Sequence, residues 1–199
     1  MTINDIKRSA IFHKLDVVNA TPTYTFFDKT DDDTAQAQLK KLQYVISRIP
    51  NVPNIYEFGT AKGHFGLLLH KLLKKFYLTT IDNDPRSLRS VIALRNVLKY
   101  NQHLTFRLSN SRRIKNLPRY NLVFVDGDKD EHGMKHEIEL AFKSRSNIIV
   151  VNRHIEKDYR LDMQKWVNEV VIKYPDMYTW QPTSWDNDDK KGMIIFVRN

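Results

Sequence analysis

The 199-residue chain contains no cysteine, few glycines and prolines, and no long apolar run. Without cysteine it can form no disulfide and offers no thiolate as a nucleophile or ligand. It also lacks the roughly 20 consecutive apolar residues that a membrane-spanning helix needs. Its polar N-terminal stretch does not resemble a secretory signal. We therefore expect a cytoplasmic, globular protein with no membrane partner.

The chain is basic, because its 32 Lys and Arg residues exceed its 23 Asp and Glu residues and give a net charge of +9. A basic surface attracts nucleic acid, anionic substrates or membranes, although it can also serve solubility alone. The basic residues fall in several short groups and form no single long run. The charge therefore leaves nucleic acid open as a partner without establishing it.

Strand-like apolar runs alternate with helical patterns from residue 50 onward. The expected strands are 54–58, 77–81, 104–108, 121–125, 147–151, 178–182 and 193–197. The expected helices are 34–49, 63–76, 85–100, 130–143 and 156–174, with a short helical turn near 111–116. The alternation predicts an α/β fold, a Rossmann-like, doubly wound, seven-stranded sheet that is mostly parallel. Because no helix separates the last two strands, we expect them to form a C-terminal antiparallel hairpin. Residues 1–50 then form an N-terminal arm and helix, and 51–199 the ligand-binding domain.

A glycine-rich loop follows the first strand, where ligands bind in sheets of this kind. Glu57 ends the strand, and Gly59, Gly63 and Gly66 precede an apolar helix. Glycines let the backbone approach a ligand closely, and a helix N-terminus offers N–H groups to an anion. The acid can hold an ammonium group. The glycine spacing is not the G-x-G-x-x-G of dinucleotide sites, and a plain strand-to-helix turn remains the alternative.

Polar residues also follow the second and third strands. Asp82 comes about twenty residues after the glycine loop and can accept both ribose hydroxyls of a nucleoside cofactor. Asp84, directly before Pro85, is expected to cap the next helix. Asn110 can either contact an adenine edge or cap the short helical turn that follows it.

The fourth strand runs into Asp126-Gly127-Asp128-Lys129-Asp130. A carboxylate at this position can bind a divalent cation or a substrate hydroxyl. Lys129 can act as a general base only where burial or another cation lowers its pKa. The alternative is a solvated turn in which Asp130 caps the next helix.

The fifth strand ends in Asn152-Arg153-His154, and His154 is a candidate base or ligand. His64, inside the glycine loop, is a similar candidate. A histidine in a loop can also be incidental, so neither residue establishes a site by itself.

Together these residues resemble the class I S-adenosylmethionine (SAM)-dependent methyltransferases over about residues 50–199. The stretch from Glu57 to Gly66 is similar to their first motif, and Asp82 is similar to their ribose-binding acid. Residues 124–130 resemble the cation-dependent O-methyltransferases of the caffeoyl-CoA and catechol types, and a bacterial group acting on sugars and antibiotics. In the cation-dependent enzymes, the Asp matching Asp126 binds a magnesium-like ion and the Lys matching Lys129 is the proposed base.

The chain departs from that pattern at the fifth strand, where the cation-dependent family carries Asp-Asn as metal ligands. Asn152 can still ligate a hard cation, but the guanidinium of Arg153 opposes one. Either the divalent cation is lost, or Arg153 takes over its charge.

The resemblance implies a SAM-dependent methyltransferase that modifies a hydroxyl of a small molecule or sugar. SAM would be held by Glu57, Gly59, Gly63, Asp82, Asn110 and Asp126. Catalysis would involve Asp126, Lys129 and His154, and any metal would be bound by Asp126 and Asn152. Two alternatives stay open: a nucleic-acid methyltransferase, and a non-catalytic interaction protein with the same fold.

Overall fold

The computed structural model describes residue 5 and residues 32–128, 130–152, 169–179 and 193–199. Seven strands form one sheet in the order β3-β2-β1-β4-β5-β7-β6. They are β1 (Asn54–Phe58), β2 (Phe76–Asp82), β3 (Gln102–Leu108), β4 (Leu122–Val125), β5 (Ile148–Val151), β6 (Met177–Thr179) and β7 (Ile194–Arg198). Strands β1 to β5 are parallel, and β7 is antiparallel to both β5 and β6. The predicted fold class and closing hairpin are confirmed.

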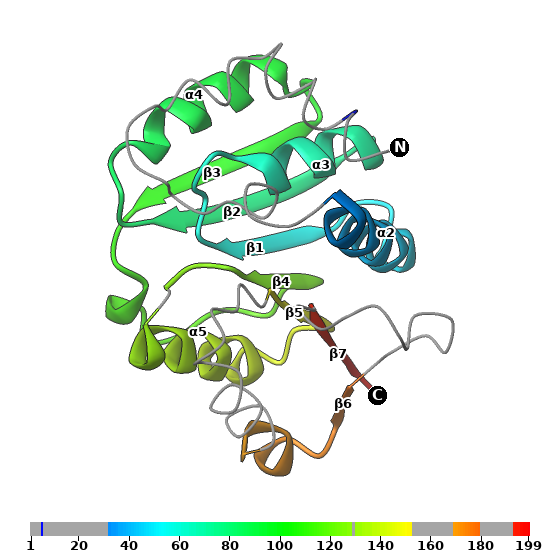
Figure 1. Cartoon of the computed structure of the whole chain (residues 1–199), viewed down its shortest axis with the longest axis vertical. Helices are drawn as coiled ribbons and strands as arrows, with labels where there is room; N and C mark the ends of the chain where they lie inside the picture. Colours follow the sequence, from blue (N-terminus) through cyan, green and yellow to red (C-terminus); the bar gives the residue numbers. More distant parts are fainter. Residues whose placement is uncertain (1–4, 6–31, 129, 153–168, 180–192) are drawn as a thin grey trace.

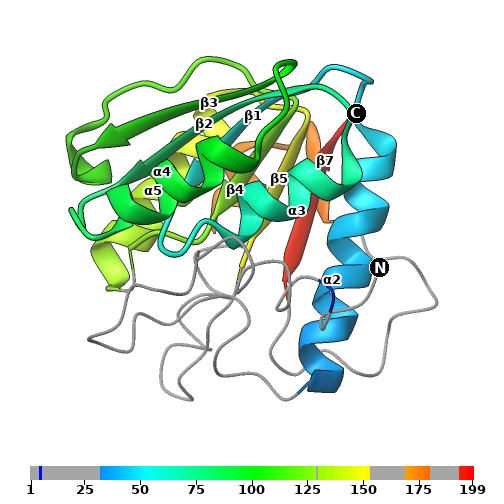
Figure 2. The same ribbon diagram turned by 90° about the horizontal axis from the view of Figure 1, so that it is seen from above.

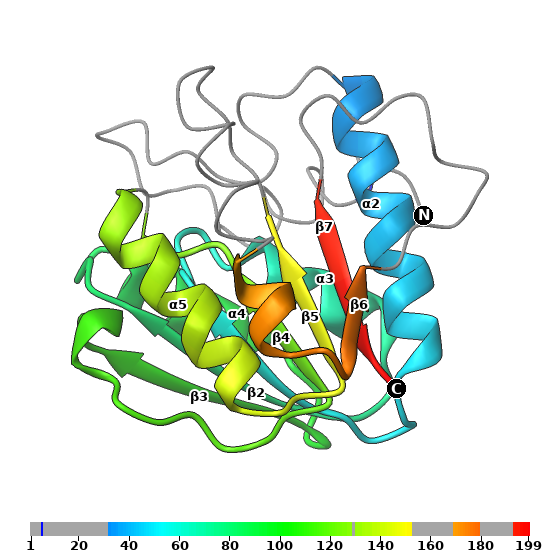
Figure 3. The same cartoon turned by 90° about the horizontal axis from the view of Figure 1, so that it is seen from below.

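Helices cover both faces of the sheet (Figure 1). On one face lie α2 (Asp32–Arg48), α3 (His64–Leu72) and α4 (Ser87–Val97), and α5 (Glu131–Lys143) lies on the other, which Figure 3 shows from its own side. A single 3-10 turn, η1 (Ser111–Arg113), stands between β3 and β4. No helix of the described residues is both long enough and apolar enough to cross a membrane.

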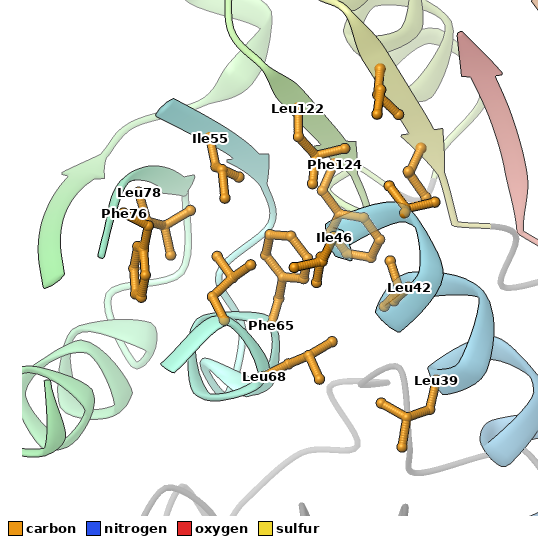
Figure 4. Close-up of a cluster of buried hydrophobic side chains, with 14 of the residues drawn as sticks. Leu39, Leu42, Ile46, Ile55, Phe65, Leu68, Phe76, Leu78, Leu122 and Phe124 are labelled. Atoms are coloured by element: carbon orange, nitrogen blue, oxygen red, sulfur yellow. The ribbon is translucent and has the colours of Figure 1, made fainter. Parts of the chain in front are cut away.

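Each face of the sheet carries its own apolar core. On the first face, side chains of α2 and α3 meet those of the central strands (Figure 4). The rings of Phe65 and Phe124 stack there with centroids 4.3 Å apart. Because α2 lies beside α3 and contributes Leu42 and Ile46, the segment before β1 is part of this core (Figure 2). On the second face, α5 contributes Ile138 among its buried side chains.

Two predicted helices are too long. The first ends at Leu72, because Leu73 is extended and Phe76, with no exposed surface, begins β2. The second begins at Ser87 because Pro85 lies in the preceding turn, and it ends at Val97. Most of the predicted helix 156–174 lies outside the described residues, of which 169–173 are helical.

Candidate active site

The carboxyl ends of β2, β1, β4 and β5 meet at one edge of the sheet. Phe58 of β1 is level with Ile81 of β2 and Val125 of β4, and Val125 is level with Val151 of β5. Parallel pairing therefore gathers the residues that follow these strands, Asp82, Asp126 and Asn152, around Glu57.

The glycines of the first loop serve packing as well as ligand access. Gly59 has φ +87°, and a Cβ there would lie 2.3 Å from the carbonyl oxygen of Asp126. The loop after β1 thus rests directly on the loop after β4. Gly63 has φ +75° and caps α3, with room around it, whereas Gly66 packs against Leu94 of α4. Only the first two glycines belong to the loop itself.

A pocket opens between this loop, α2 and α3. It brings together three of the predicted site residues, Glu57, Gly59 and Asp126, and adds His64. The first N–H groups of α3, which a helix leaves without intrahelical acceptors, lie at the same loop. The lining residues are Leu42, Glu57, Gly59, Thr60, Ala61, Lys62, His64, Phe65, Leu68, Phe124 and Asp126. The pocket therefore combines carboxylates, a helix N-terminus and an apolar wall.

Glu57 is the most unusual group in the pocket, because it is an acid with only 2% of its surface exposed. Burial raises its pKa well above the usual range, a hydrogen bond with Thr80 opposes this, and the charges of Asp126 and Asp82 raise it further. No described Lys, Arg or His forms an ion pair with it. A ligand cation that entered here would favour the ionised form of Glu57, which forms no ion pair with a described residue.

Asp82 holds the glycine loop in place. Its two carboxylate oxygens accept hydrogen bonds from the backbone N–H groups of Ala61 and Asp84, both at 2.8 Å. Burial raises the pKa of Asp82, and these hydrogen bonds oppose the rise. Because an ionised carboxylate has about four acceptor positions, two hydrogen bonds leave capacity for ribose hydroxyls.

Two other polar residues at this edge hold the backbone that leads into a helical segment, and of these Asn110 is an N-cap whereas Asp84 acts in the turn before α4. The Asp84 carboxylate accepts from the backbone N–H of Arg86 at 2.9 Å and pairs with its guanidinium, ahead of α4. The Asn110 side chain accepts from the backbone N–H of Arg112 at 2.9 Å and so caps η1. Of the two alternatives for Asn110, the structure shows the capping role.

The loop after β4 is held by Arg112 from η1. Its guanidinium donates to Asp128, with Nε 2.9 Å from Oδ2, and also pairs with Asp130. Asp130 caps α5 by accepting from the backbone N–H of Gly133 at 2.9 Å, as predicted for the solvated-turn alternative. Two of the three carboxylates of this loop are therefore structural, and Asp126 is the one that lines the pocket.

The predicted catalytic residues Lys129 and His154 lie outside the described residues, as does Arg153. Asn152, only 1% exposed, follows β5 directly and is a neighbour of Asp126 across the sheet. The part of the chain that the structure describes contains no group of three or more His, Cys, Asp or Glu that could hold a metal ion. The metal prediction thus stays a prediction.

Glu137 of α5 is a site residue that sequence reasoning missed. It is 1% exposed, accepts from the backbone N–H of Asp128 at 3.1 Å, and would lie 2.4 Å from a Cβ on Gly127. Burial raises its pKa to about 7, against hydrogen bonds from Ser111 and Asp128. The sequence offered a partial signal, because Glu137 lies at helical spacing from the apolar Met134, Leu140 and Ala141, so an acid falls on the apolar stripe of the helix.

Comparison with known proteins gives structural matches alone, since no family model and no curated protein matches the chain. The match to a candidate RNA methyltransferase from Pyrococcus horikoshii covers 100% of this chain and 98% of that protein, with a TM-score of 0.62 and 15% sequence identity. The match to a candidate caffeoyl-CoA O-methyltransferase from Staphylococcus aureus covers 98% of this chain and 92% of that protein, with a TM-score of 0.58 and 19% sequence identity. The match to a ribosomal protein L11 methylase from Lactobacillus delbrueckii covers 85% of this chain and 80% of that protein, with a TM-score of 0.55 and 12% sequence identity.

These neighbours have different acceptors, so they resolve no subgroup. At such low identities they show the fold, and the fold is one that methyltransferases share. The chain therefore has the fold of the SAM-dependent methyltransferases.

Proposed function

We propose that this protein transfers the methyl group of SAM to a hydroxyl acceptor. The observation that carries the proposal is the buried Glu57 carboxylate, which faces a pocket at the N-terminus of α3 and has no described cationic partner. SAM carries an ammonium, a carboxylate and a sulfonium, so it needs an acid and an anion site side by side. Glu57 with Asp126 offers the acids, and the α3 N-terminus suits the carboxylate.

The residues present fit the nucleoside part as well. Asp82, at the end of β2, has acceptor capacity for the two ribose hydroxyls. The apolar wall of the pocket, including Phe65 and Leu68, excludes water from the cofactor's side chain. Bound SAM supplies an electrophilic methyl carbon. The chain's own residues have to position the acceptor oxygen in line with it and exclude water.

Methyl transfer forms an oxygen–carbon bond while the carbon–sulfur bond breaks and its electron pair passes to sulfur. The acceptor proton must then pass to a base. We propose Lys129 as that base, with Asp126 beside the acceptor and His154 as a further candidate, all following strand ends. Glu137 keeps the loop of Asp126 in position from beneath.

The resemblance of residues 124–130 to O-methyltransferases supports a small molecule or sugar as the acceptor. Nucleic acid is the second candidate, favoured by the net charge of +9. The non-catalytic alternative predicts that SAM binds but no acceptor is methylated.

Calorimetric titration with SAM, S-adenosylhomocysteine and NAD tests the proposal. We expect saturable SAM binding in the wild type, much weaker binding in Glu57→Gln, and no change in Glu139→Gln, which removes a carboxylate from α5 outside the pocket. Repeating the titration with magnesium tests the metal. Binding of NAD in preference to SAM, or an unchanged affinity in Glu57→Gln, would refute the proposed site.

A further inference from the structure

The whole net charge of the protein comes from one acid-free segment. Residues 85–125 contain nine Lys and Arg and no Asp or Glu. Outside the segment, 23 Lys and Arg balance 23 Asp and Glu. The segment includes α4 and β3, which lie at one edge of the sheet, and η1, which packs against α5 (Figure 1). The excess positive charge is therefore concentrated in one stretch of the sequence, part of which is the edge strand β3.

Part of this flank is an open face of the sheet. Because β3 connects to β4 through η1 in place of a full helix, no described helix covers β2 and β3 on the α5 side. Tyr77 is 45% exposed there, and its ring stacks on that of His103 with centroids 4.7 Å apart and planes 6° apart. Thr105 and Arg107, which follow His103 at two-residue intervals on β3, are exposed on the same face.

Three basic side chains of β3 and of the segment that follows it have no acidic partners in the described part of the chain. Arg113 and Lys115, which follow β3, are exposed, and neither they nor Arg107 form an ion pair with a described residue. This contrasts with Arg86 and Arg112, which pair with carboxylates. We call the exposed Tyr77, His103, Thr105 and Arg107, together with Arg113 and Lys115 of the segment that follows β3, the β2–β3 face.

We propose that the β2–β3 face binds a single-stranded nucleic acid and delivers it to the methyl-transfer site. An exposed aromatic pair on a sheet offers a stacking platform for unpaired bases, and cations without acidic neighbours hold the phosphate backbone. A duplex hides its bases and gains little from such a pair. An acidic peptide would use the charges, but it has no base to stack on Tyr77.

The face ends at the edge of the sheet that carries the candidate active site. Arg107 is level with Ile81, one residue before Asp82, whereas the pocket of Glu57 opens on the α3 side of that same edge. Beyond it, Arg112 of η1 holds Asp128 in the loop after β4. Six residues of β2, from Tyr77 to Asp82, span about 17 Å, so a strand along the face would reach this edge. The inference rests on the proposed function for its substrate role, but the binding itself can be tested separately.

Fluorescence anisotropy with a labelled single-stranded RNA 20-mer, without SAM, measures the binding. The test variant replaces Arg107, Arg113 and Lys115 by Gln. The matched control replaces the exposed Lys71, Lys74 and Lys143, which lie away from the face, and loses the same charge. Losing three phosphate contacts should make the negative slope of log K against log salt shallower by about 2, and the control should keep the wild-type slope.

A second variant, Tyr77→Ala, tests the stacking. It should weaken single-strand binding roughly tenfold and leave the salt slope unchanged. Equal weakening in the control triple variant would overturn the proposal, because the charge would then act without a defined surface. Tighter binding of duplex than of single strands, or capture of an acidic peptide alone, would overturn it too.

Methyl incorporation into the same 20-mer and SAM calorimetry separate this inference from the proposed function. Strand binding without any SAM binding would refute the methyltransferase and leave the face intact. SAM binding and methylation of small hydroxyl compounds, without strand binding, would refute the face alone.

Discussion

Replacing Glu137 by Gln should abolish a specific pH dependence of stability. Glu137 is 1% exposed, lies under the loop of Asp128, and has its pKa raised from 4.5 to about 7, chiefly by burial. Below about pH 4.5 the carboxyl group is protonated in both the folded and the unfolded protein and contributes no difference. As the pH rises, the unfolded chain loses this proton first, and the folded state is penalised for holding a buried acid.

The shift of about 2.5 pKa units corresponds to about 3 kcal/mol. The free energy of unfolding of the wild type should therefore fall by about this amount, through this one group, between about pH 4.5 and 8. The amide of Gln does not ionise, so the variant lacks this fall. The stability difference, variant minus wild type, should rise by up to about 3 kcal/mol over that range.

Urea unfolding followed by tryptophan fluorescence at several values between about pH 5 and pH 8 measures the difference. Using the difference removes the effects of Glu57 and Asp82, whose pKa values are also raised. The amide also adds N–H donors opposite the N–H of Asp128, which shifts the difference by a constant amount without changing its slope. Glu139→Gln, on the same helix, is the control. A flat or falling difference would show that the hydrogen bonds to Glu137 outweigh its burial.

Three further outcomes follow from the site. Gly59→Ala should destabilise the fold by several kcal/mol, because its Cβ would lie 2.3 Å from a backbone oxygen. Gly63→Ala should cost only about 1 kcal/mol, because it adds the strain of a positive φ without a clash, and urea unfolding of both variants measures the difference. Asp82→Asn should weaken SAM binding in calorimetry beyond its effect on thermal stability, since it removes acceptors for ribose. SAM binding should release a proton from Glu57, so the affinity should rise as the pH approaches the raised pKa of Glu57. Calorimetry in two buffers of different ionisation enthalpy detects the released proton, and the same binding heat in both buffers would contradict the prediction.

The central strands were predictable because they are short apolar runs bounded by polar or turn residues, whereas the edge strand β3 is more polar and begins at Gln102, two residues before its predicted start. Leu122–Val125 and Ile148–Val151 are buried at every position, as central parallel strands must be. Helix ends were less predictable. The chain after Leu72 still reads as helical, yet burial of Phe76 in the core draws it into β2.

The candidate site was partly predictable for a related reason. Parallel strands place their carboxyl ends at one edge, so Glu57, Asp82 and Asp126 could be assigned to one site from their positions in the sequence. What each residue does there depended on its partners in space. Asn110 is a cap, and Asp82 holds the glycine loop as well as offering acceptors.

The sequence alone determined the fold class and the strand ends that carry the site, because hydrophobic periodicity and turn residues act over short distances along the chain. The tertiary structure decided which groups are buried together. Only packing could place Glu137 beneath the loop of Asp128 and raise its pKa, since burial is a property of neighbours in space. The same holds for the β2–β3 face, where strand pairing stacks Tyr77 on His103, and where both stay exposed because the crossover from β3 to β4 lacks a full helix.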